Sequence, residues 1–157
     1  MSNLGTNLDD LYREIILDHY RSPRNRGELD SPPAIRVEGF NPLCGDEIVV
    51  YLDVQDGVLK NIKMNGSGCS ISQSSASLMS AAVKGKPVEQ VRETVATFKQ
   101  LMTVQEATLA HDGEPPVVDL RALGELAALQ GVIKFPVRIK CATLAWNTLV
   151  QGLDELN

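Results

Sequence analysis

The chain has 157 residues, of which 43% are hydrophobic and 22% are charged. This length predicts one domain around one core, and this balance excludes both a disordered chain and a small disulfide-rich secreted scaffold. The formal net charge of -5 disfavours nucleic acid as the main partner, because phosphate binding requires a basic face.

Neither a membrane span nor a secretion signal is expected. No stretch approaches the roughly 20 apolar residues that cross a bilayer, and the N-terminal MSNLGTNLDDLYREI lacks the basic and then apolar order of a signal peptide. We therefore expect a cytoplasmic protein with no membrane partner. In a reducing cytosol its three cysteines are not expected to form disulfides, which leaves metal binding or thiol chemistry.

The first half of the chain predicts a helix followed by strands. Apolar residues recur at helical spacing over 8–20, and a loop rich in Pro, Gly, Arg and Ser separates them from a short strand at 35–40. Alternating apolar residues then predict two strands at 47–54 and 58–65. The Asp56-Gly57 pair between them is typical of a tight hairpin turn.

The second half predicts helices. Small and apolar residues indicate a helix from Ser70 to about 84, and the next begins at Pro87 and ends near 101. A short helix is expected within 119–129, and a last one follows Pro136 to the C-terminus. The predicted fold class is α+β, with an antiparallel sheet packed against about five helices in a single domain.

Three cysteines and one aspartate lie at or near the ends of predicted elements. Cys44 and Asp46 share the turn segment NPLCGDE, where a spacing of two places both side chains on one face of an extended segment. Cys69 lies where a strand gives way to a helix. Cys141 lies about one turn into the last helix, where the helix dipole and the adjacent cations Arg138 and Lys140 should favour its thiolate. Three thiolates and one carboxylate would suit tetrahedral zinc.

Simpler interpretations of the same residues stay open. A lone cysteine is often just a small buried hydrophobe, and no CxxC pair supports a metal site by spacing alone. His19 is interpreted as a packed or capping residue and His111 as part of a solvated loop, so neither is assigned to the site. The serine run at 72–80 has no base spaced to activate it and is attributed to close helix packing.

Ordered motifs along the chain resemble the U-type iron–sulfur cluster assembly family (SufU/IscU type, similar to the NifU N-terminal region). They are NPLCGD at 41–46, GSGCSISQSSASLM at 66–79, KGK at 84–86 and GVIKFPVRIKCATLAW at 131–146. The resemblance implies the family fold, a three-stranded antiparallel sheet packed against helices, as one domain over 1–157.

The family has a scaffold branch, with a histidine just before the third cysteine, and a zinc-containing sulfurtransferase branch. This chain has Lys140 at that position and an inserted segment at about 103–130, and both features resemble the sulfurtransferase branch. The resemblance therefore implies a zinc-dependent sulfurtransferase. The alternatives are a scaffold that assembles an iron–sulfur cluster on the same cysteines, and a noncatalytic domain that zinc merely supports.

The resemblance also implies roles for individual residues. Cys44 would accept persulfide sulfur from a pyridoxal-phosphate cysteine desulfurase of the SUF system (SufS type), for use by a downstream SUF assembly scaffold. Arg138 and Lys140 would position groups or contact a partner. The implied zinc ligands are Cys44, Asp46, Cys69 and Cys141.

Overall fold

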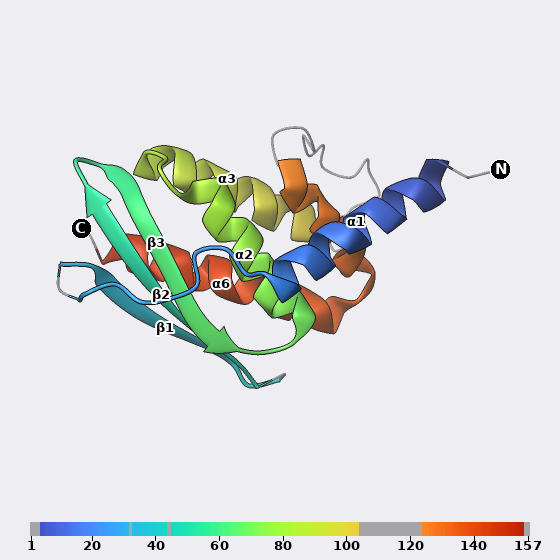
Figure 1. The fold of residues 1–157 in the computed structure, drawn as a ribbon, viewed down its shortest axis with the longest axis horizontal. Coiled ribbons are helices and arrows are strands. Elements are labelled where there is room, and N and C mark those ends of the chain that lie inside the picture. Colours follow the sequence, from blue (N-terminus) through green and yellow to red (C-terminus); the bar gives the residue numbers. More distant parts are fainter. Residues whose placement is uncertain (1–3, 32, 44, 104–123, 156–157) are drawn as a thin grey trace.

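Three antiparallel strands form one sheet in the order β1-β2-β3, and helices pack against it (Figure 1). This sheet confirms the three-stranded antiparallel sheet that the resemblance implied. In this computed structural model, residues 4–31, 33–43, 45–103 and 124–155 are described. The strands of the sheet are β1 (Ile35–Asn41), β2 (Asp46–Gln55) and β3 (Val58–Ser67).

The hairpin between β2 and β3 turns at the predicted residues. Asp56 has φ 53° and Gly57 has φ 74°. Two successive positive φ values make a turn whose twist matches that of the flanking strands, and they explain why Asp-Gly occupies this position. Beyond a one-residue shift in pairing between Asp53 and Val54, the register places Leu52 opposite Ile62 and Glu47 opposite Ser67.

The predicted α+β class is confirmed by four α-helices and one 3₁₀-helix in the described chain. The first helix begins four residues earlier than predicted, and Pro87 lies just before its helix instead of within it. The helices are α1 (Leu4–Arg21), α2 (Ser70–Val83), α3 (Val88–Met102), η1 (Gly124–Lys134) and α6 (Pro136–Asp154).

The helix expected within 119–129 is a 3₁₀-helix that starts and ends later, at Gly124–Lys134. Leu126, Leu129 and Val132 are all buried and lie three residues apart, which matches the three-residue turn of this helix type. Most of the segment predicted as an insertion, together with His111, lies outside the described residues.

The core lies between the inner face of the sheet and the helices. The Phe98 ring from α3 stacks on Trp146 from α6, with ring centroids 4.1 Å apart and an interplanar angle of 9°. Both side chains are fully buried and belong to one apolar cluster with the inward-facing strand residues. Those strand residues include Ile48, Val50, Leu52, Leu59 and Ile62.

The serines of α2 serve packing, as predicted. Ser75 Oγ donates to the Ala142 carbonyl at 2.6 Å and accepts Trp146 Nε1–H at 3.0 Å, so α2 is fixed against α6. His19 is buried, with Nδ1 2.7 Å from Ser77 Oγ, which confirms its packed role. These contacts hold α2 in place, and the residue before its first turn is Cys69.

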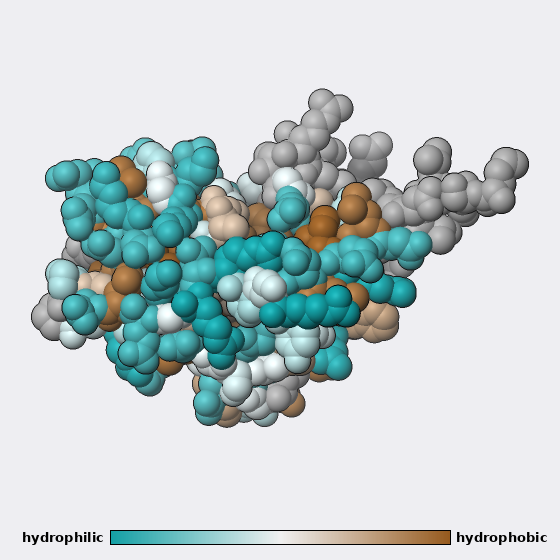
Figure 2. Space-filling view, in the orientation of Figure 1, coloured by the Kyte–Doolittle hydropathy of each residue, from teal (hydrophilic) through white to brown (hydrophobic). Residues whose placement is uncertain are grey.

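Hydrophilic residues dominate the face shown in Figure 2, and hydrophobic residues gather mainly towards the end of the molecule where α1 lies. Within the described chain, none of the helices combines the length and apolar character needed to span a bilayer.

Candidate metal centre

The strand register brings Asp46 and Cys69 together. Asp46 is the first residue of β2, and its neighbour Glu47 pairs with Ser67, the last residue of β3. Because the strands are antiparallel, the chain that leaves β3 passes beside Asp46. The backbone N–H of Cys69 donates to Asp46 Oδ1 at 3.1 Å.

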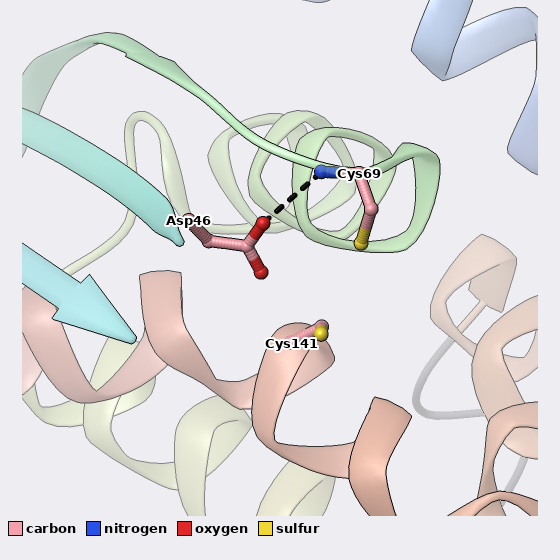
Figure 3. Close-up of side chains that lie close together, drawn as sticks. All are labelled: Asp46, Cys69 and Cys141. Carbon is pink, nitrogen blue, oxygen red and sulfur yellow. Dashed lines mark hydrogen bonds between the residues drawn. The ribbon is translucent and has the colours of Figure 1, made fainter. Parts of the chain in front are cut away.

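Cys141 reaches the same point from α6. This helix packs against β1, β2 and α2, and Cys141 is almost fully buried. The carboxylate of Asp46 and the thiols of Cys69 and Cys141 point toward one another (Figure 3), and their ligand atoms lie within 4.8 Å of one another. In a tetrahedral zinc site with bonds of about 2.0 to 2.3 Å, ligand atoms are about 3.3 to 3.8 Å apart, so a small inward movement would suffice.

The Asp46 carboxylate has one oxygen without a partner. Asp46 is 1% exposed, and its Oδ2 has no hydrogen-bond partner within the described part of the chain. A buried carboxylate oxygen that is neither hydrogen-bonded nor paired with a cation is costly, whereas a bound metal ion would satisfy it. Together with two facing thiols, this oxygen makes a donor set that fits zinc.

Cys69 lies at the N-terminus of α2, where backbone N–H groups are free to bind an anion. Burial alone would raise the pKa of its thiol. Hydrogen bonds with the backbone N–H and the hydroxyl of Ser72 outweigh burial, and the pKa is lowered even though the charge of Asp46 opposes this. Cys69 is therefore predisposed to the thiolate form that binds metals.

Arg138 lies beside both thiols. The negative charge of Cys69 raises the pKa of the Arg138 guanidinium, and a hydrogen bond with Cys141 contributes in the same direction. Arg138 is exposed on the first turn of α6, so a permanent cation faces solvent at the edge of the cluster. Lys140 is also exposed, on the same helix.

Gly68 provides space beside Asp46. A Cβ at this position would lie 2.5 Å from Asp46 Oδ1 and would also collide with Ser72 Oγ. Both contacts are too short for real atoms, so any larger residue would displace the carboxylate. The glycine is therefore required by the close approach of the chain to the cluster.

Three of the four predicted ligands converge, and the fourth, Cys44, lies outside the described residues. Sequence reasoning assigned the helix-dipole benefit to Cys141, but Cys141 is the sixth residue of α6 and its Sγ lies 3.8 Å from the Val137 carbonyl. Cys69 is the thiol at a helix N-terminus. Ser72 and Gly68 were missed, although a glycine before a cysteine at the start of a helix suggests close backbone approach.

Comparisons with known proteins agree with this arrangement. Residues 11–142 match the NifU-like N terminal domain. The chain is 42% identical to the zinc-dependent sulfurtransferase SufU of Bacillus subtilis (strain 168), over 98% of this chain and 96% of the relative. It is 39% identical to the iron–sulfur cluster assembly scaffold protein IscU of Thermotoga maritima, over 94% of this chain and 95% of the relative.

Solved structures show the same fold. The crystal structure of FiSufU, a proposed iron–sulfur cluster assembly scaffold protein for the SUF system of Fervidobacterium islandicum AW-1, superposes with a TM-score of 0.77 and 28% identity. The superposition covers 89% of this chain and 94% of FiSufU. Near-complete coverage in sequence and in structure confirms the resemblance of the motifs, and the chain belongs to the NifU-like N-terminal domain family, together with the SufU and IscU proteins.

Proposed function

We propose that the protein is a zinc-dependent sulfurtransferase of iron–sulfur cluster assembly, which accepts persulfide sulfur from a cysteine desulfurase of the SufS type. The observation that carries the proposal is the buried Asp46 carboxylate, with one unsatisfied oxygen facing the thiols of Cys69 and Cys141. The relative from Bacillus subtilis, 42% identical over nearly the whole chain, is named a zinc-dependent sulfurtransferase.

In this proposal four residues hold the metal: Asp46, Cys69 and Cys141 from the observed cluster, and Cys44 from the adjacent turn. Zinc, when bound, favours the thiolate form of its cysteine ligands near neutral pH. The lowered pKa of Cys69 acts in the same direction. Asp46 supplies the one oxygen ligand, which is a weaker ligand for zinc than a thiolate.

The sulfur acceptor in this proposal is Cys44. Its thiolate attacks the terminal sulfur of a persulfide on the desulfurase cysteine and forms a new S–S bond to that sulfur. The old S–S bond breaks, and the desulfurase cysteine leaves as a thiolate with the electron pair, so no external oxidant or reductant is consumed. Arg138, an exposed cation beside the cluster, would attract the anionic persulfide.

Exposed apolar side chains beside the cluster support a protein donor. Phe40 and Leu43 are 59% and 63% exposed near the β1–β2 turn, and Phe135 and Val137 are 60% and 59% exposed at the start of α6. We call these four residues the apolar rim. Large apolar side chains left exposed next to a reactive site are typical of a protein-docking surface. We propose the desulfurase as its partner, followed by the downstream SUF scaffold.

Assembly of a cluster on the same cysteines is the second candidate. It is favoured by the Thermotoga maritima relative, 39% identical and named a scaffold, because similarity at this level does not separate the two activities. Two thiols and a carboxylate in reach of one another could also hold iron. The family resemblance disfavours the scaffold role, because the scaffold branch has a histidine just before the third cysteine and this chain has Lys140 there.

Metal analysis distinguishes the two candidates. We expect protein purified with and without oxygen to carry about one zinc per chain, since three thiolates and a carboxylate complete a four-coordinate site, and to be colourless. Elemental analysis with a visible spectrum makes the measurement. A brown anaerobic sample with iron in place of zinc would support the scaffold function and reject the proposed one.

Replacing Gly68 with alanine tests whether Asp46 must stay where it lies. The added methyl group would push the carboxylate away from the thiols, and disturbed support of a metal ligand typically lowers metal affinity by about 10- to 100-fold. Competition with a zinc chelator measures the change. Gly85→Ala is the control, because Gly85 has open space around it and its φ of 82° makes the alanine strain the backbone, so the variant shows what destabilisation does to zinc affinity when nothing pushes on Asp46. Equal zinc affinity in both variants would refute the role of Gly68.

A further inference from the structure

Asn41 makes three contacts where β1 ends beside the cluster. It is 7% exposed, and β1 pairs it with Asp46, so it lies directly across from the carboxylate ligand. Its side-chain Oδ1 accepts the backbone N–H of Leu43 at 3.1 Å, and its carbonyl oxygen accepts the backbone N–H of Gly45 at 2.8 Å. Asn41 therefore holds the residue on each side of Cys44.

The local sequence explains this geometry. Pro42 has no N–H and a fixed φ, so the first donor available after Asn41 belongs to Leu43, and an asparagine side chain is the right length to accept it. Gly45 has φ 70°, which lets the chain turn back into β2. Asn41 thus accepts both hydrogen bonds that fix the turn between the strands.

The third contact leads to the cluster. Asn41 Nδ2 lies 4.0 Å from Cys141 Sγ and is the donor of a hydrogen bond to this sulfur. Sulfur accepts weak hydrogen bonds, so this contact links the turn directly to the side chain of a proposed ligand. A turn-forming serine would accept the Leu43 N–H equally well, but it could not reach Cys141. The amide therefore does more than form a turn.

We propose that Asn41 is a positioning residue, which fixes the turn residues Leu43 and Gly45 on either side of Cys44 and links that turn to the sulfur of Cys141. The proposal rests on the proposed function for the meaning of Cys44, but its contacts exist independently of any sulfur transfer. A hydrogen bond to the sulfur of a metal ligand orients that ligand and tunes its donor strength. Asn41 thus connects β1 to two of the proposed ligand segments.

Two substitutions separate the two side-chain contacts of Asn41, the one with the Leu43 N–H and the one with Cys141 Sγ. Asn41→Ser keeps a short acceptor for the Leu43 N–H and loses the donor to Cys141, whereas Asn41→Ala loses both. Asn61→Ala is the matched control, because Asn61 Oδ1 also accepts a backbone N–H, that of Ile62 at 2.9 Å, on β3 opposite Asp53 and away from the cluster. Thermal unfolding of each metal-free variant verifies that it folds.

Two readouts do not depend on activity. The sulfur-to-metal charge-transfer bands of the Co²⁺-loaded protein are sensitive to the hydrogen bond from Asn41 Nδ2 to Cys141 Sγ. Both Asn41→Ser and Asn41→Ala lack this donor, so we expect the bands to shift in both variants. Alkylation of Cys44 by iodoacetamide in metal-free protein, resolved by mass spectrometry, reports the turn, and we expect it to accelerate in Asn41→Ala but not in Asn41→Ser. Asn61→Ala should match the wild type in both.

Sulfur transfer supplies a third readout. We expect transfer to slow by about 10- to 100-fold in Asn41→Ala, with the desulfurase concentration for half-maximal transfer unchanged, since the apolar rim is intact. Unchanged cobalt bands and unchanged Cys44 alkylation in both Asn41 variants would overturn the proposal. If Asn41→Ala fails to fold, the cobalt bands of Asn41→Ser alone test the proposal, and unchanged bands overturn it. If the wild type accepts no sulfur, the proposed function is wrong, but the cobalt bands and the Cys44 alkylation still test the role of Asn41.

Discussion

Cys44→Ser is expected to abolish the stimulation of a cysteine desulfurase by this protein. A serine hydroxyl is not ionised at neutral pH and cannot hold a transferable sulfane sulfur, so both the attack and the product are lost. Asp46, Cys69 and Cys141 would remain in place, and we expect part of the zinc to be retained. Desulfurase-dependent alanine release, zinc content and the mass of the persulfide on Cys44 make the measurement.

Two further variants distinguish the loss of a sulfur acceptor from a general disturbance of the site. Ser67→Ala changes an exposed residue at the end of β3 close to the cluster and should keep full stimulation. Cys69→Ser should lose activity together with zinc, because Cys69 is one of the three converging side chains that we propose as ligands. If Cys44→Ser keeps full stimulation, Cys44 is not the sulfur acceptor, and a zinc site that only supports folding becomes the better interpretation.

Much of the fold follows from local pattern. The alternation of apolar residues at 47–54 and 58–65 predicts strands because a strand with one buried face has a period of two. The Asp56-Gly57 pair predicts the hairpin turn because it tolerates positive φ, and the structure has φ 53° and 74° there. The 3₁₀-helix at Gly124–Lys134 was predicted only as a short helix with earlier bounds, since Ala- and Leu-rich residues favour several helical forms.

The site was harder to predict, because it depends on pairing between distant strands. The approach of Cys69 to Asp46 results from the Glu47–Ser67 register, and no local pattern reveals a register between strands. The resemblance to a known family supplied the ligand set that spacing alone left open. Asn41 was missed because a buried amide donor toward sulfur is a property of the assembled fold, although the Asn-Pro pair does indicate a turn.

Removal of zinc is expected to lower the melting temperature markedly. A ligand that saturates the folded state at a thousandfold excess over its dissociation constant stabilises it by about 4 kcal/mol. For a domain of this size each kcal/mol shifts the midpoint by about 2 to 4 °C, so chelation should lower the melting temperature by roughly 8 to 16 °C. The loss is smaller than in a zinc finger, because the apolar cluster around Trp146 keeps the metal-free chain folded.

Cys141→Ser separates metal binding from simple packing, because Cys141 is buried and could be only a small apolar residue. If Cys141 is a ligand, the variant should melt near the temperature of the chelated wild type, and added zinc or chelator should no longer change it. If Cys141 only fills space, serine should destabilise the protein by the same amount with and without zinc, and the zinc-dependent shift should survive. Calorimetry of both proteins, each with excess zinc and with excess chelator, gives the four midpoints. An unchanged wild-type midpoint after complete zinc removal would contradict a stabilising metal site altogether.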